Sequence, residues 1–131
     1  MGNIVSLAGR KQKHLLNHDV AGLLCEWAHY CNSWGLMGDT EVMVYEHMVS
    51  IMDNLGNCAT TTADISMSLG ITVTTIVKAL RGITRAGDFF SKIEMPRDTV
   101  NARGFSKPVF LKMDISGALI DLDRFKSVEG V

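Results

Sequence analysis

Histidine and cysteine side chains recur at a spacing of four residues near the start of the chain. His14 and His18 form one such pair, and Cys25 and His29 form another. Residues four positions apart share a helix face, so each pair has the spacing to bind a metal ion. The pairs lie about 10 Å apart at ~1.5 Å rise per residue, so one ion cannot bind all four side chains. A metal site would need a further ligand, from His47 or a second subunit, and we predict none.

The cysteines and carboxylates give no sign of catalysis. Cys25, Cys31 and Cys58 are an odd number of cysteines without a CxxC motif, which favours reduced thiols in a cytoplasmic protein. No adjacent cation activates a redox pair of Cys25 with Cys31 or Cys58. The GxSxG, P-loop, GxGxxG and HExxH motifs are absent. We therefore predict no enzyme activity and no cofactor, and no apolar run reaches the roughly 18–20 residues that span a bilayer.

Hydroxyl and basic side chains between residues 72 and 85 have a spacing suited to nucleic acid. Thr74, Lys78, Arg81 and Arg85 are separated by four, three and four residues, so a helix places them on one face. The opposite face carries an apolar stripe of Val73, Ile76, Val77, Leu80 and Ile83. Hydroxyl groups and helix N-terminal N–H groups suit phosphates, and arginine or lysine can pair with guanine.

The elements that position these residues follow from periodicity and from helix-ending signals. Helices are predicted over 14–32, about 41–55, 62–69, 73–86 and 116–128, after a loose tail at 1–13. A T-x-x-D pattern with Asp64 caps the third helix, Gly70 ends it, and Gly87 ends the fourth. Residues 57–60 are expected to be a connector. Alternating residues predict strands over 89–95 and 109–113, joined by a basic loop at 96–106 into a β-hairpin.

This order resembles the winged helix-turn-helix superfamily of DNA-binding proteins. The stretch TTADISMSLGITVTTIVKALRGITRAGDFF (61–90) resembles its core, and the likeness covers roughly residues 41–113. The expected buried positions are Ile65, Leu69, Ile71, Val73, Ile76, Leu80 and Ile83. The resemblance implies a mainly α-helical fold with a small β-hairpin, in which helix 73–86 enters the major groove and the hairpin forms a wing.

The charge of the chain supports this division. The net charge is −1, from 13 basic and 14 acidic residues. Residues 1–58 hold 3 basic and 6 acidic side chains, residues 59–113 hold 8 and 4, and residues 114–131 hold 2 and 4. The excess of positive charge therefore lies in residues 59–113, the segment predicted to bind DNA. A near-zero total excludes a polybasic, non-specific binder but leaves a specific one open.

The segments at 14–38 and 114–131 flank the winged-helix core at 39–113. Regulators of the multiple-antibiotic-resistance type resemble this plan, and their flanking helices from both chain ends make a dimer. The resemblance implies a homodimer. The predicted interface residues are Leu23, Trp27, Tyr30, Trp34, Leu119, Leu122 and Phe125.

The sequence therefore predicts a sequence-specific, duplex DNA-binding transcriptional regulator from a prokaryotic, phage or plasmid setting. Base contacts are predicted for Thr72, Thr74, Thr75, Lys78 and Arg81, and backbone contacts for Arg85, Arg97, Arg103 and Lys107. The alternative is a winged-helix protein-interaction module, such as an inhibitor, adaptor or replication accessory protein, since fold does not decide function. The operator and any small-molecule effector are left open.

Overall fold

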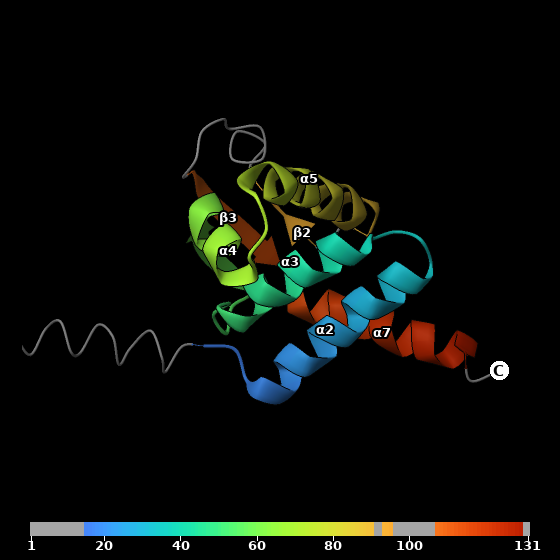
Figure 1. The fold of residues 1–131 in the computed structure, drawn as a ribbon. Helices are drawn as coiled ribbons and strands as arrows, with labels where there is room; N and C mark the ends of the chain where they lie inside the picture. The colour runs from blue at the N-terminus through green and yellow to red at the C-terminus, as the bar shows by residue number, and fades with distance from the viewer. Residues whose placement is uncertain (1–14, 91–92, 96–106, 130–131) are drawn as a thin grey trace, which may run out of the picture.

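The computed structural model of the chain describes residues 15–90, 93–95 and 107–129, without the side chains of residues 87–90 and 129. Helices and a small antiparallel sheet make up these ranges (Figure 1), which confirms the mainly α-helical fold class. In chain order the elements are α2 (His18–Ser33), α3 (Asp39–Ser50), β1 (Asn57–Thr61), α4 (Thr62–Leu69), α5 (Val73–Phe90), β2 (Ile93–Glu94), β3 (Pro108–Met113) and α7 (Ile115–Glu129).

Side chains of the residues just before α2 and α4 fix where these helices begin. The Asn17 side chain accepts a hydrogen bond from the Asp19 N–H (2.8 Å) at the start of α2. Thr61 Oγ1 accepts from the Asp64 N–H (3.0 Å), which confirms the T-x-x-D cap of α4. Gly70 ends α4 in the left-handed region at φ 68°, a conformation open to glycine at little cost.

The sheet has the strand order β1-β3-β2, and both pairings are antiparallel. The expected β-hairpin is present, since Ile93 of β2 faces Met113 of β3. The prediction of a connector at 57–60 is wrong, because residues 57–61 form a strand in which Cys58 lies opposite Leu111. Five residues carry too little alternation to indicate a strand, and the pairing partner lies about fifty residues later in the chain.

Two predicted boundaries after residue 50 are also wrong. The helix expected to reach residue 55 ends at Ser50, and a turn follows in which Asp53 Oδ1 accepts from the N–H groups of Leu55 (2.9 Å) and Asn57 (2.8 Å). The helix expected to end at Gly87 continues to Phe90, so β2 is shorter than the predicted strand at 89–95. An internal glycine costs a helix only about 1 kcal/mol, so it need not end one.

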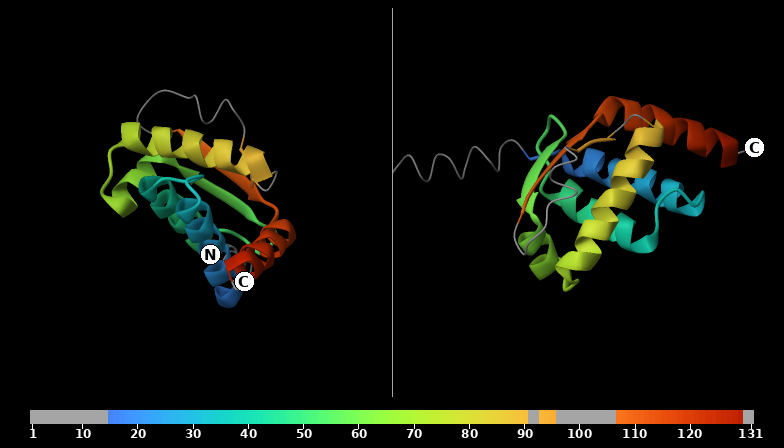
Figure 2. Two further views of the ribbon diagram at one scale, coloured as in Figure 1. Left: turned by 90° about the vertical axis from the view of Figure 1, so that its right-hand side faces the viewer. Right: turned by 90° about the horizontal axis from the view of Figure 1, so that it is seen from above.

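The helices lie against one face of the sheet (Figure 2). Among the described residues, a cluster of buried side chains joins the helices to this face. Helix α2 packs against α3 and α7, and α5 packs against α3, α4 and β2. Trp27 of α2 and Tyr45 of α3 are fully buried, with ring centroids 5.7 Å apart.

No single described helix is long and apolar enough to cross a membrane. Residues 62–69 and 73–86 pass this test together on length and composition only, and they are bent by 107° at the break between them.

Candidate nucleic-acid interface

Helices α4 and α5 form the predicted helix-turn-helix. The chain turns by 107° between them, within the roughly 90–120° typical of this motif. The turn is tied to α4, because the Gly70 N–H donates to the Ser66 carbonyl (2.8 Å) and the Ser66 hydroxyl donates to the Ile71 carbonyl. Ile71 packs against the core. These contacts fix the direction in which α5 leaves the turn.

The outer face of α5 carries three of the residues predicted for base contacts and one, Arg85, predicted for backbone contact. Thr74, Lys78, Arg81 and Arg85 are all exposed. Within the ranges that the structure describes, none of the three cations forms an ion pair. Three exposed cations on one face of a helix suit a polyanion.

The buried face of α5 is broader than the predicted stripe. Ile76, Leu80 and Ile83 are fully buried as expected, whereas Val73 and Val77 are only half-buried. The small residues Ala79 and Ala86 are buried in their place. The helix is therefore rotated slightly from the predicted orientation, and the cations stay on the solvent side.

Gly82 lies on the buried face of α5, against the carboxylate of Glu41 on α3. A Cβ atom built on Gly82 would collide with the Glu41 side chain. A glycine inside a helix permits either close packing with a neighbouring element or close approach of the helix to DNA. The structure gives the first, because Gly82 is buried and faces another helix.

The threonines at the start of α5 have two different environments. The Thr72 and Thr75 hydroxyls lie 2.9 Å apart, and Thr72 Oγ1 also accepts from the Thr75 N–H (3.3 Å). Thr72 therefore caps the N-terminus of α5. Thr72 remains exposed and Thr75 is half-buried. Each hydroxyl takes part in the cap, and Thr74 is exposed beside them.

The return from the wing is attached to α4. Thr62 is nearly fully buried, its N–H donates to the Lys107 carbonyl (2.9 Å), and its Oγ1 accepts from the Lys107 N–H (3.1 Å). Lys107 itself is half-buried. The predicted wing residues Arg97 and Arg103, and the basic loop at 96–106, lie outside the described residues. Sequence reasoning missed the role of Thr62, because a buried threonine resembles any other in sequence.

The residues predicted to form a dimer interface on the flanking helices differ in how deeply they are buried. Trp27, Leu122 and Phe125 are buried within the core of this one chain, so the structure corrects their assignment to a dimer surface. Leu23, Tyr30 and Leu119 are half-buried, and Trp34 is 52% exposed. The Phe125 ring stacks on the Tyr30 ring, with centroids 5.7 Å apart, and lies tilted against the Trp34 ring, with centroids 5.3 Å apart. The aromatic spacing that indicated a dimer therefore also serves to join α2 to α7.

Cys25 and His29, one of the two pairs noted in the sequence, both lie next to the Glu46 carboxylate of α3, and His14 of the other pair lies outside the described residues. Glu46 of α3 lies 3.4 Å from His29 Nε2. Burial and then the neighbouring Glu46 charge raise the pKa of Cys25 to about 11. Among the described residues, no group of three or more His, Cys, Asp and Glu side chains is arranged to hold a metal ion.

Comparisons with protein-family models, with curated proteins and with solved structures return no match for this chain.

Proposed function

We propose that this chain is a winged helix-turn-helix protein that binds duplex DNA sequence-specifically and regulates transcription. The observation that carries the proposal is the exposed face of α5, where Lys78, Arg81 and Arg85 share one side of a helix whose opposite side is buried. The major groove of B-DNA is about 12 Å wide and admits one α-helix. The order α3, β1, α4, α5, β2, β3 adds support, since a hairpin follows the second helix of the motif.

The position of each residue along α5 indicates which part of the DNA it contacts in this proposal. Thr72, Thr74 and Thr75 lie at the N-terminal end, which points into the groove in this class of motif. Lys78 and Arg81 follow one and two turns later, and Arg81 can donate two hydrogen bonds to guanine O6 and N7. Arg85 lies a turn further on and contacts phosphate. Lys107, at the end of the wing, also contacts phosphate, and its backbone N–H is bonded to the Thr62 hydroxyl.

A homodimer that reads two half-sites is part of this proposal. Dimers of this class bind half-sites about one helical turn apart, which adds affinity without new contacts per protomer. The exposed Trp34 and the half-buried Leu23, Tyr30 and Leu119 supply the surface. A cytoplasmic location in a prokaryotic, phage or plasmid setting goes with this role.

The test starts from selection of bound sequences out of a random duplex pool. The selected duplex is then titrated at two salt concentrations with the wild-type chain and with Lys78→Ala/Arg81→Ala. We expect affinity to fall roughly tenfold or more in this variant, since one bidentate base contact contributes about 1–3 kcal/mol. Arg124→Ala/Lys126→Ala on α7 removes the same charge far from α5 and is the matched control (Figure 1).

Equal affinity of the two double variants would contradict the placement of α5 in the groove. A DNA binder also shows log K falling linearly with log salt, with a slope set by the phosphate contacts. If no duplex is enriched and binding is absent or insensitive to salt, the DNA proposal fails and the protein-interaction module takes its place.

A further inference from the structure

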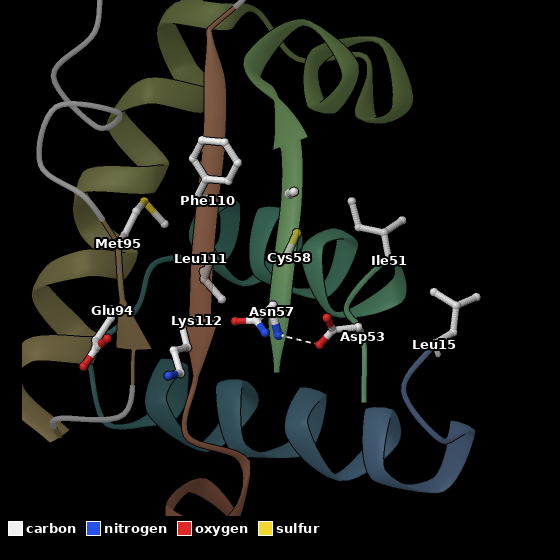
Figure 3. A pocket seen from close by; sticks show the side chains of 11 residues that line it. Leu15, Ile51, Asp53, Asn57, Cys58, Glu94, Met95, Phe110, Leu111 and Lys112 are labelled. Atoms are coloured by element: carbon white, nitrogen blue, oxygen red, sulfur yellow. Dashed lines mark hydrogen bonds between the residues drawn. The ribbon is translucent and has the colours of Figure 1, made fainter. Parts of the chain in front are cut away.

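A groove of about 940 Å³ lies on the face of the sheet that turns away from the helices (Figure 3). Its apolar walls include Leu15, Ile51 and Phe110, which are 46%, 38% and 51% exposed. The Phe110 side chain stands on the outer face of β3, opposite Ala59 of β1. Large apolar side chains gathered in one exposed hollow are typical of a surface that another segment covers.

The groove extends along the free edge of β1. In the order β1-β3-β2, β1 pairs with a strand on one side only. On its other side Asp53 already bonds both the N–H and the carbonyl of Asn57, so the unpaired edge begins at Ala59, and Figure 3 places Ile51 and Leu15 on this side. Leu15 already forms an antiparallel β-bridge with Asp53, and the Leu16 N–H donates to the Met52 carbonyl (3.0 Å). The chain therefore enters the described fold in an extended form at this edge. Proteins commonly cover such edges, because unpaired strand groups bind other strands.

Charge separates the first residues of the chain from the helices that follow. Residues 15–58 contain no lysine or arginine. They contain six carboxylates, at Asp19, Glu26, Asp39, Glu41, Glu46 and Asp53. Residues 1–13 contain Arg10, Lys11 and Lys13 and no carboxylate. Of these carboxylates only Asp53 lines the groove, where Asp53 and Glu94 stand against Lys112. The groove lining therefore has a small excess of negative charge, which a positively charged segment complements.

We propose that the groove binds the chain's own apolar segment at residues 4–8, Ile-Val-Ser-Leu-Ala, as a strand added at the edge of β1. Six residues lie between Ala8 and Leu15, and the seven Cα–Cα steps that join them span at most about 25 Å when extended, which brings the segment within reach of the groove. A short tether gives an effective concentration of about millimolar, so weak apolar contacts suffice. This occupant supplies apolar residue types (Ile4, Val5 and Leu7) for the apolar walls at Phe110 and Ile51, followed by basic residues at 10–13 for a lining with a small negative excess.

The test uses a chain that begins at His14 and a synthetic peptide of residues 1–13, followed by hydrogen exchange. In the full chain we expect residues 4–8 and the β1 amides to exchange at least about tenfold more slowly than in the chain without residues 1–13. Adding the peptide to the shortened chain should restore the protection of β1. A peptide with Val5→Asp and Leu7→Asp keeps the basic residues and should restore none.

Two groove variants separate the groove from other apolar surface. Phe110→Ser should abolish peptide binding, whereas Leu55→Ser, at a leucine that is 71% exposed outside the groove lining, should leave it intact. Equal exchange in the full and shortened chains, or peptide binding that survives Phe110→Ser, overturns the proposal. Protection that rises with protein concentration assigns the groove to a second copy and also overturns it. No DNA is present in these measurements, so their outcome is separate from that of the proposed function.

Discussion

Thr62 illustrates how one side chain joins distant parts of this chain. Its backbone N–H and its hydroxyl together hold both the carbonyl and the N–H of Lys107, forty-five residues later. The same residue begins α4, directly after the Thr61 cap. The start of the helix-turn-helix and the return from the wing are therefore fixed to each other at a single residue.

Replacing Thr62 by valine keeps the shape of the side chain and removes the acceptor for the Lys107 N–H. We expect Thr62→Val to lower the free energy of unfolding by about 1–3 kcal/mol, because a backbone donor loses its partner. Urea denaturation measures this change. Thr60→Val, two residues earlier on β1, is the control, because no described hydrogen bond involves its side chain, and it should change stability by less than about 0.5 kcal/mol. Equal effects at both positions would show that the Thr62 hydroxyl contributes nothing specific.

Most of the candidate interface was predictable at the scale of residues. The spacing of Thr74, Lys78, Arg81 and Arg85 assigns them to one helix face, and all four are exposed in the structure. Spacing could not identify the partner of a buried residue. Trp27 and Phe125 illustrate this, because an apolar aromatic on a helix fits the chain's own core as well as a dimer surface, and both are buried.

At the scale of elements, the packing of α3 against α5 depends on Gly82. The absence of a side chain lets the Glu41 carboxylate occupy the space that a Cβ atom would need. The same glycine lowers the intrinsic helix stability by about 1 kcal/mol relative to alanine. Helix propensity and interhelical contact therefore oppose each other at this position.

A double-mutant cycle measures that opposition. In the wild-type background, Gly82→Ala gains helix propensity but displaces the Glu41 carboxylate, so we expect only a small change in stability. In a Glu41→Ala background the collision is gone, and Gly82→Ala should stabilise the protein by roughly the full ~1 kcal/mol of propensity. Additive effects, within about 0.5 kcal/mol by chemical denaturation, would show that the two residues do not compete for this space.

At the scale of the whole molecule, burial keeps several weak acids in their protonated form. Burial raises the pKa of Cys25 and Cys58 from 9.0 to about 11, and that of Cys31 to about 12. Burial also raises the pKa of the Tyr45 hydroxyl well above 10.0. In each case the folded protein holds its proton at a pH where the unfolded chain releases it.

Stability should therefore fall at alkaline pH. The contribution of these groups is complete below about pH 9 and is lost as pH rises through about 11 to 12, because each folded pKa lies above the unfolded one. Denaturant midpoints measured at pH 8, 9, 10 and 11 follow this loss. Cys58→Ala removes one group and should make the decline shallower. Midpoints that stay constant up to pH 11 would contradict the prediction.

The sequence alone determined the features that depend on near neighbours along the chain. The T-x-x-D cap, the glycine after α4 and the 3.6-residue period of α5 act within a few residues, so the helix-turn-helix and its basic face could be predicted. Only the tertiary structure decided the features that depend on distant partners. These are the pairing of β1 with β3, the burial of Trp27, Leu122 and Phe125, and the contact of Gly82 with Glu41. Such contacts join residues tens of positions apart, and no local pattern identifies the partner.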